Sequence, residues 1–409
     1  MNSYEELPVK ATGLSLVFIA TAVAGALGYV ITVLLARLLG QDYGQFAIFW
    51  SALYLVIGSL AGLQQETARA SSIGIQPKKS STFSLIIIAF AIAFGLFFVI
   101  LLSSPLWEEQ LFGASYGIYL IPFSVGAGLW VLVSFLMGAL YGSHQWRLVA
   151  LTLVLDVALR AGLVLIFPFL GWNQSALPWL VILPFALMLV IVWNLSSRKL
   201  TSNFTIDVPT KQLLFNFSKT LIASLSMSII VSGFPLILGA TTKSISSSSL
   251  SAIIFAVILT RAPLVMVAMS LQSYFIIFFR DRRKPSFGVV SKIFLIVVSA
   301  ALVFGVFAFW LANPIIIFLA GSNFSLSPVF LALLTVSSAS TALLSLTGSA
   351  VLASSRHTFY SLGWLTGAAA TLGIMFLPLE VEAKSVLALS IGPILGILIH
   401  LMGLFISKK

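Results

Sequence analysis

The chain has 409 residues, of which 60% are hydrophobic and 8% are charged, and its net charge is +11. A typical soluble domain carries about 25% charged residues, and a soluble exterior cannot be covered by so much hydrocarbon. The composition therefore excludes a soluble enzyme, a soluble nucleic-acid-binding domain and a disordered protein, and it predicts a polytopic membrane protein.

The amino-terminal segment Met1–Lys10 is polar, and no small-residue cleavage site follows the apolar run after it. This pattern predicts a retained first transmembrane helix and not a cleavable signal. The chain has no cysteine, which excludes disulfides and thiolate chemistry. Its three histidines lack metal-ligand spacing and no Walker A run is present, so we expect neither a metal nor another cofactor.

Twelve apolar runs of the length that a transmembrane helix needs, about 20 residues, follow one another along the chain. They are continuous and do not alternate in polarity, which favours helices over barrel strands. The predicted spans are Thr12–Leu35, Phe46–Leu63, Phe83–Leu102, Ile118–Leu140, Leu148–Leu170, Ala176–Trp193, Leu213–Ala240, Leu250–Phe279, Phe287–Leu311, Leu326–Leu352, Phe359–Leu377 and Ser385–Ile406.

The charges between the spans predict the orientation of the chain. With the amino terminus in the cytoplasm, sixteen of the 22 Lys and Arg residues lie on the inner side and three on the outer side, while acidic residues divide evenly. This positive-inside pattern supports twelve spans and predicts that both termini lie in the cytoplasm. Anionic lipid or an anionic substrate is the other explanation of the basic excess.

The polar segment Asn194–Gln212 divides the predicted spans into two sets of six. We therefore predict an all-α polytopic fold of about twelve transmembrane helices in two pseudo-symmetric six-helix lobes, residues 1–199 and 200–409. Two repeats with an even number of spans are parallel in topology, which predicts a substrate site between them near the membrane midplane.

Ionisable residues inside the spans are candidates for function, because a charge at the bilayer centre costs about 2.5–3.5 kcal/mol on insertion scales. Arg261 lies mid-span with Pro263 after it and no acidic residue within a turn or two. Such a guanidinium needs water, a distant partner or an anionic ligand such as phosphate. The alternative is a structural bond to carbonyls that a kink at Pro263 frees.

Asp156 and Arg160 are spaced i, i+4 on the fifth span. They can form a self-neutralising pair, or Asp156 can couple transport to an ion while Arg160 lines a pathway. Lys219 lies about two turns into the seventh span, where it can snorkel to the inner surface or line a cytoplasmic port.

Polar residues also mark the ends of the second and eighth spans. Glu66 and Arg69 are spaced i, i+3, which predicts an interfacial pair, with one lip of the same port as the alternative. Gln65 and Gln272 are candidates for hydrogen bonds to a sugar or to another helix.

Residues Ala36–Ala47 read ARLLGQDYGQFA, and Gly62–Arg69 read GLQQETAR. The first run resembles the segment between spans one and two in the polysaccharide-exporter (Wzx-type) branch of the multidrug/oligosaccharidyl-lipid/polysaccharide (MOP) flippase superfamily, and the second is similar to the end of its second span. In purely structural terms, Gly40 and Gly44 are expected to form a tight outer turn, with Arg37 reaching outward.

The resemblance implies a MATE/MOP-like fold and alternating access. The cargo would be a polyprenyl-diphosphate-linked glycan, whose head group crosses a cationic central cavity while its lipid tail stays among the membrane lipids. Basic residues on spans one, two, seven and eight line that cavity in such families, which implicates Arg69, Lys219 and Arg261 here. Polymerase or glycosyltransferase partners of the same pathway are compatible with this function, and no nucleic acid is expected.

Two other functions are weighed against a flippase. A multidrug or cation antiporter of the same fold expects acidic residues buried in the lobes, but Asp156 is the one acid inside a predicted span and Arg160 can neutralise it. A membrane glycosyltransferase or ligase would need a catalytic acid or base on a substantial outer loop, whereas the predicted outer loops are short.

Overall fold

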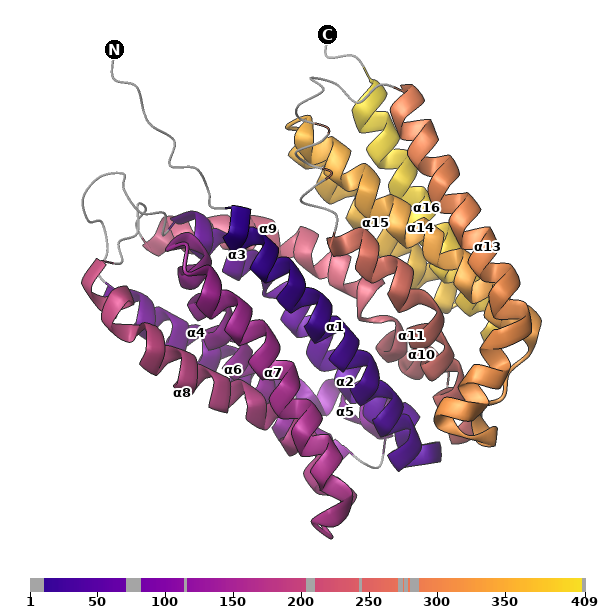
Figure 1. The fold of residues 1–409 in the computed structure, drawn as a ribbon, viewed down its shortest axis with the longest axis horizontal. Helices are drawn as coiled ribbons and strands as arrows, with labels where there is room; N and C mark the ends of the chain where they lie inside the picture. Colours follow the sequence, from indigo (N-terminus) through magenta and orange to yellow (C-terminus); the bar gives the residue numbers. More distant parts are fainter. Residues whose placement is uncertain are drawn as a thin grey trace. The chain divides into compact units, whose positions relative to one another are not determined.

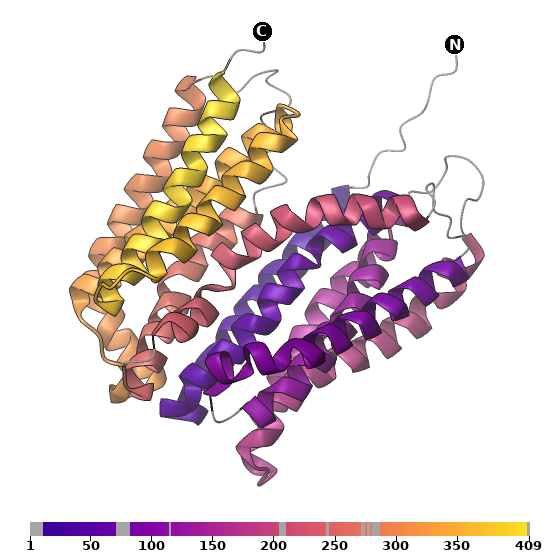
Figure 2. The same cartoon turned by 180° about the vertical axis from the view of Figure 1, so that it is seen from behind.

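The computed structural model describes residues 11–70, 82–113, 116–203, 210–242, 245–270, 275, 279 and 287–406. The secondary structure of these residues is entirely helical, as Figures 1 and 2 show from opposite sides. The helices of the amino-terminal half are α1 (Ala11–Leu39), α2 (Tyr43–Ser59), α3 (Ala61–Ala70), α4 (Thr82–Ser103), α5 (Glu108–Phe112), α6 (Tyr116–Gly142), α7 (Trp146–Ile166) and α8 (Leu177–Asn203). Those of the carboxy-terminal half are α9 (Thr210–Val231), α10 (Phe234–Thr241), α11 (Ser247–Ser270), α13 (Phe287–Ala320), α14 (Pro328–Ala353), α15 (His357–Met375) and α16 (Val381–Phe405).

Apolar runs become helices because hydrocarbon offers no partner to backbone N–H and C=O groups, which must then pair within the segment. Nine stretches of the described residues are long and apolar enough to cross a membrane. The first, Ser15–Ala70, contains most of the first predicted span and all of the second, and α15 overlaps the eleventh. The eighth predicted span, Leu250–Phe279, is helix α11 up to Ser270, and beyond that point only Phe275 and Phe279 belong to the described residues. The prediction of an all-α polytopic fold with about twelve spans is therefore confirmed.

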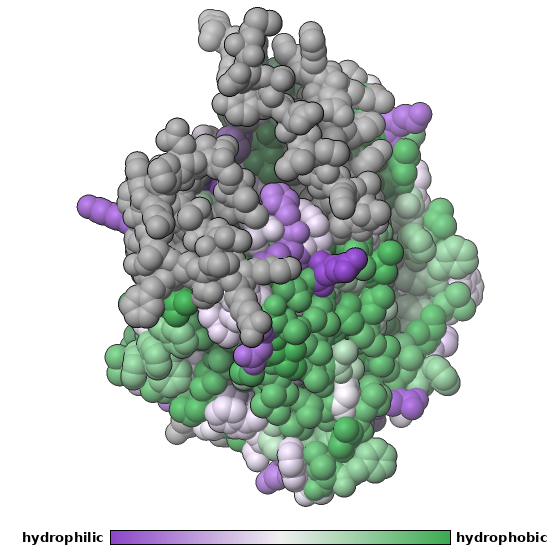
Figure 3. All heavy atoms as spheres, turned by 60° about the vertical axis from the view of Figure 1, so that its left-hand side comes forward, coloured by the Kyte–Doolittle hydropathy of each residue, from purple (hydrophilic) through white to green (hydrophobic). Residues whose placement is uncertain are grey.

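The exterior has the apolar character that a lipid-facing surface requires. Large hydrophobic side chains are exposed along α4 and α13, including Phe94 at 60% and Phe318 at 74%. Figure 3 shows hydrophobic side chains over a large part of one face. Exposed side chains of this kind are expected where lipid takes the place of water.

Three helix boundaries differ from their predictions. The predicted seventh span is two helices, α9 and α10, because Gly233 and Pro235 interrupt the run: Pro235 lies in the first turn of α10, where its missing N–H costs nothing. The second span ends at Ser59, and α3 follows as a separate short helix. The ninth continues past Leu311 to Ala320 with Pro314 inside it.

The turn between α1 and α2 depends on one glycine. Gly40 has φ +53°, a left-handed conformation that glycine adopts without strain. Gly44 does not shape this turn as expected but lies in α2, where its N–H donates to Ser251 Oγ at 2.7 Å. Arg37 donates from its guanidinium to the carbonyls of Leu319 and Phe318 at the end of α13.

The contacts divide the chain into two compact units. The first comprises Met1–Ile31, Gly62–Phe98 and Val125–Phe217, and the second comprises Thr32–Ala61, Val99–Ser124 and Ser218–Lys409. Each unit is built from several chain segments, so the two predicted lobes, 1–199 and 200–409, stay a prediction.

In the second unit, α14 contacts α11, α13, α15 and α16. Glycines permit close approach of α15 and α16: a Cβ on Gly396 would lie 2.5 Å from the carbonyl oxygen of Gly363. His400 fills the neighbouring space, with Nδ1 3.0 Å from Thr347 Oγ1 and Nε2 3.1 Å from the carbonyl oxygen of Tyr360. Backbone-to-backbone contact of this kind is how small residues stabilise helix pairs in membranes.

Replacing Gly396 with Ala should lower the free energy of unfolding by about 1–3 kcal/mol, because the new Cβ overlaps backbone that cannot move aside. Gly373 of α15 is the control, since nothing lies within 4 Å of a Cβ there. Gly373→Ala should leave stability unchanged or raise it slightly through helix propensity. Thermal unfolding of the two purified variants in detergent would compare them, and equal stability would contradict the close packing of α15 on α16.

Candidate functional site

Arg261 is a buried guanidinium in the second unit whose described partner is a hydroxyl group. It lies on α11, is 5% exposed, and donates from Nη2 to Thr341 Oγ1 of α14 at 2.8 Å. Its Nε–H has no acceptor, and no described carboxylate lies within ion-pair distance. The described hydrogen bond of Arg261 goes to a side chain of α14. The side chain of Pro263 lies outside the described residues, so the alternative of a bond to carbonyls freed near Pro263 stays a prediction. The guanidinium therefore keeps an N–H donor that no described acceptor uses.

Helix α14, which Arg261 contacts, is rich in hydroxyl groups. Thr335, Ser337 and Ser338 are buried and donate to carbonyls one turn back on their own helix. Ser345 is fully buried, and its hydroxyl has no partner. It lies four residues after Thr341, so the two side chains share one face of α14.

Arg261 thus projects onto a face that carries a second unsatisfied polar group. An unsatisfied buried polar group costs about 1–3 kcal/mol, and more when it is charged. The sequence pointed to Arg261 but not to Thr341 or Ser345. The available signal was the i, i+4 spacing of two hydroxyl residues within a serine-rich span.

Asp156 and Arg160 form the pair that their spacing predicts. Arg160 Nη2 lies 2.7 Å from Asp156 Oδ1, and both residues are buried in the first unit. Arg160 also donates from Nε to the carbonyl of Val181 on α8 at 3.2 Å, and its guanidinium lies 5.2 Å from the ring centre of Phe185. The pair therefore joins α7 to α8, close to Pro184, and this arrangement favours the structural interpretation.

Arg69 is held by Glu66 in two hydrogen bonds, Nε to Oε2 at 2.9 Å and Nη2 to Oε1 at 2.6 Å. Asn216 of α9 also donates to Glu66 Oε1, at 2.7 Å. The Arg69 side chain is nevertheless 49% exposed, and Gln65 on the same short helix is exposed too. This end of the first unit presents a half-exposed cation beside a neutralising carboxylate.

The other two candidates lie beyond what the structure describes. Lys219 is part of α9, but its side chain is outside the described residues, and Gln272 is wholly outside them. Within the described part of the chain, no group of three His, Asp or Glu residues could hold a metal ion.

Small residues of α2 form a seam with α9, α10 and α11 in the second unit. Gly44, Ser51 and Gly58 recur every seven residues, so they share one helix face. Ser51 Oγ donates to the carbonyl of Ser232 at 2.6 Å, and Ser228 Oγ donates to the carbonyl of Leu55 at 2.9 Å. We call the contacts of Gly44, Ser51 and Gly58 the α2 seam.

The chain is similar to other proteins in sequence and in fold. No family model matches the chain. The chain is 30% identical over 396 residues to the uncharacterized protein Rv3630 of Mycobacterium tuberculosis (strain ATCC 25618 / H37Rv), covering 94% of this chain and 90% of that protein. It belongs to the Rv3630 family. A second mycobacterial protein, the uncharacterized protein Rv1510, is 29% identical over 97% of this chain and 92% of its own length.

Solved structures show which fold this member of the Rv3630 family has. A multidrug resistance MATE family transporter of the MOP superfamily, in an inward-facing conformation, matches with a TM-score of 0.72, covering 94% of both chains. Lipid II flippase MurJ matches with 0.69, covering 95% of this chain and 87% of MurJ, and the eukaryotic MATE transporter AtDTX14 with 0.63, covering 97% and 96%. Each is 14% identical, so the likeness shows the fold alone, and the expected MATE/MOP-like fold is confirmed.

Replacing Arg160 with Met would leave the Asp156 carboxylate buried without its partner, and should lower the free energy of unfolding by about 3–5 kcal/mol. The double variant Asp156→Leu/Arg160→Met removes both charges and should recover most of that loss. Thermal unfolding in one detergent would compare the two. A double variant as unstable as the single one would contradict a purely structural role for the pair. The hypothesis that Asp156 couples transport to an ion would then be favoured.

Proposed function

We propose that this protein is a flippase of the Wzx-type branch of the MOP superfamily. It moves a polyprenyl-diphosphate-linked oligosaccharide from the cytoplasmic to the outer leaflet of the bacterial inner membrane, with both termini in the cytoplasm. The observation that carries the proposal is the buried Arg261, which has a hydroxyl partner and an unused Nε–H but no described carboxylate.

A diphosphate is the chemistry that suits this arrangement. Arg offers a planar set of donors that matches phosphate oxygens, and charge-assisted hydrogen bonds are about twice as strong as neutral ones. An anionic oxygen could accept from the free Nε–H of Arg261, while the hydroxyl of Ser345 adds a second donor on the same α14 face. A carboxylate partner would have neutralised the site, as Asp156 neutralises Arg160.

The fold supports transport as the general activity, since its solved neighbours are MATE transporters and lipid II flippase MurJ. Alternating access needs contacts that can separate. The α2 seam is made of Gly and Ser, which let the helices approach closely and which are joined by a few hydrogen bonds. We assign this seam the role of a contact that opens during transport.

A multidrug or cation antiporter is the second candidate, because MATE transporters are among the fold neighbours. That function needs an ionisable acid available inside the bundle. Asp156 is the acid inside the predicted spans that could serve, and it is paired with Arg160. An Asp156→Asn variant that loses proton- or sodium-driven efflux of a cationic dye, in a protein that moves no lipid-linked glycan, would establish the antiporter instead.

Arg261→Gln should reduce translocation of a fluorescent polyprenyl-diphosphate oligosaccharide in proteoliposomes by about tenfold or more, the loss expected when a charge-assisted hydrogen bond worth about 1.5–3 kcal/mol disappears. Arg37→Gln is the matched control, because Arg37 is exposed and contacts carbonyls at the end of α13. The control should translocate at the wild-type rate.

Both variants should elute as monodisperse protein with similar unfolding temperatures. An Arg261→Gln protein that folds and transports at the wild-type rate would remove Arg261 from the pathway. A wild-type protein that neither binds nor moves any diphosphate-linked glycan would contradict the proposed function.

Crosslinking the α2 seam tests alternating access in a chain that naturally lacks cysteine. A Cβ on Gly58 would lie 3.0 Å from Ser228 Cβ, close to the separation of about 3.5–4.5 Å in disulfides. Gly58→Cys/Ser228→Cys should therefore form a disulfide under mild oxidation and lose translocation, and a reductant should restore it. Each single-cysteine variant should transport under both conditions; continued transport by the oxidised, crosslinked protein would show that the seam stays closed during the cycle.

A further inference from the structure

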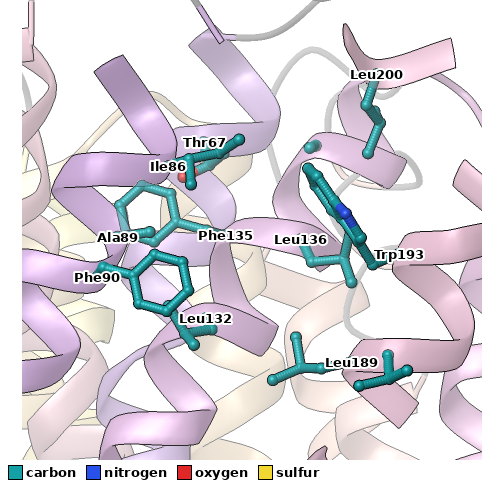
Figure 4. A pocket seen from close by; sticks show the side chains of 12 residues that line it. Thr67, Ile86, Ala89, Phe90, Leu132, Phe135, Leu136, Leu189, Trp193 and Leu200 are labelled. Atoms are coloured by element: carbon teal, nitrogen blue, oxygen red, sulfur yellow. The ribbon is translucent and has the colours of Figure 1, made fainter. Parts of the chain in front are cut away.

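The first unit contains an apolar cavity of about 410 Å³ that the flippase proposal does not use. Three helices supply aligned faces: α6 contributes residues spaced i, i+3, i+4 and i+7, which fall on one side of a helix. Figure 4 shows the side chains of α3 and α4 on one side of this space and those of α8 on the other. The lining residues are Thr67, Ile86, Ala89, Phe90, Leu132, Phe135, Leu136, Ala139, Leu189, Val190, Trp193 and Leu200.

Burial divides the lining into a floor and a rim. Ala89, Leu136 and Leu200 are less than 9% exposed and form part of the floor. Phe90 and Val190 are 47% and 60% exposed, so they lie at the rim. The cavity is therefore accessible from the side of the unit, in the surface that the hydrophobic exterior assigns to lipid.

The chemistry of the lining favours an apolar occupant. Among its twelve side chains, only Thr67 and Trp193 carry a polar atom, and Thr67 Oγ1 already donates to the carbonyl of Leu63 at 2.8 Å. A bound water needs two to four polar partners, which this cavity does not supply. The volume lies within the range of about 300–1,000 Å³ that is typical of small-ligand pockets. A hydrocarbon chain meets these conditions.

A charged group next to the cavity narrows the choice of lipid. Thr67 lies on the ten-residue helix α3, between Glu66 and the half-exposed Arg69. A lipid with its chain in the cavity thus has a cation within two residues of the lining, at the end of the bundle that the charge pattern places in the cytoplasm. Arg69 is paired with Glu66, but its side chain is 49% exposed, so a diphosphate head group, which carries more negative charge than one carboxylate, can compete for the guanidinium. This favours an anionic head group joined to a long hydrocarbon.

We propose that this cavity binds the isoprenoid chain of the diphosphate-linked cargo and holds the lipid beside α4, α6 and α8 while its head group is handled elsewhere. The inference rests on the proposed function for the identity of the cargo. It differs from that proposal in its residues, because the cavity belongs to the first unit and Arg261 to the second. The two can therefore fail separately.

Photolabelling tests the cavity directly. The full-length protein in phospholipid vesicles would be irradiated with an isoprenyl diphosphate that carries a diazirine on its chain, and separately with a phosphatidylcholine labelled at the same depth. Peptides of α4, α6 and α8 would then be read by mass spectrometry. Wild-type protein should give adducts with the isoprenyl probe on these helices, and unlabelled isoprenyl diphosphate should compete them away.

Ala89→Phe fills the floor and should reduce these adducts about tenfold, the effect of excluding a chain at a cost of about 1.4 kcal/mol. Ala91→Phe is the matched control, because Ala91 is an exposed residue of α4 outside the lining. It should label as the wild type does. Ala139→Leu fills the same cavity from α6 and serves if Ala89→Phe lowers the unfolding temperature.

Two results would overturn the inference: equal labelling in the wild type and in folded cavity-filled variants, or adducts from the phosphatidylcholine probe that isoprenyl diphosphate does not displace. The latter would make the cavity a site for bilayer phospholipid. Arg261→Gln separates the two proposals, since it should retain cavity labelling while losing translocation. Cavity labelling in a wild-type protein that moves no glycan would contradict the flippase function but not the isoprenoid site.

Discussion

The hydrocarbon around this chain offers no partner to a polar group, and most of the structure follows from that constraint. Backbone groups pair within helices, and buried hydroxyls such as those of Thr335 and Ser337 donate to carbonyls of their own helix. Arg160 pairs with a carboxylate four residues away. Because nearly every described polar group meets this requirement locally, the few that do not, Arg261 Nε and Ser345 Oγ above all, are informative. They lie on two helices that contact each other, α11 and α14.

The two buried arginines show how one residue type can serve two purposes. Arg160 is 1% exposed and has an acid on its own helix, a carbonyl on the next and an aromatic ring beside its guanidinium. Arg261 is similarly buried, but its described partner is one hydroxyl. A neutralised charge can join two helices, whereas a charge with unused donors favours the binding of an anion. The difference lies in what surrounds each guanidinium and not in how deeply it is buried.

A lipid-linked anion needs a polar environment for its head group and an apolar environment for its hydrocarbon. The chain offers these two environments in different places. The charged head needs hydrogen-bond donors within the membrane, which Arg261 and the hydroxyl face of α14 can provide. The hydrocarbon needs a dry apolar surface, which α4, α6 and α8 offer in the first unit. The α2 seam contributes a third property, close helix contact through Gly and Ser. Together these features fit the proposed flippase function, in which different residues hold the head group and the hydrocarbon.

The sequence by itself determined the class of protein, the helical spans and the pairs that are local in the chain. Apolar length predicts a helix because backbone groups must pair within the segment, and spacing predicts Asp156–Arg160 and Glu66–Arg69 because residues three or four apart share a helix face. It also predicted that Arg261 would lack a nearby acid. Gly233 and Pro235 indicate a helix break, but the continuous apolar run around them led to the prediction of a single seventh span. Only the tertiary structure decided that Arg261 meets Thr341, eighty residues away, and that three helix faces leave a cavity. Those outcomes depend on which helices pack together, and an apolar span carries almost no periodic pattern to specify its neighbours, since lipid and protein present the same hydrocarbon to it.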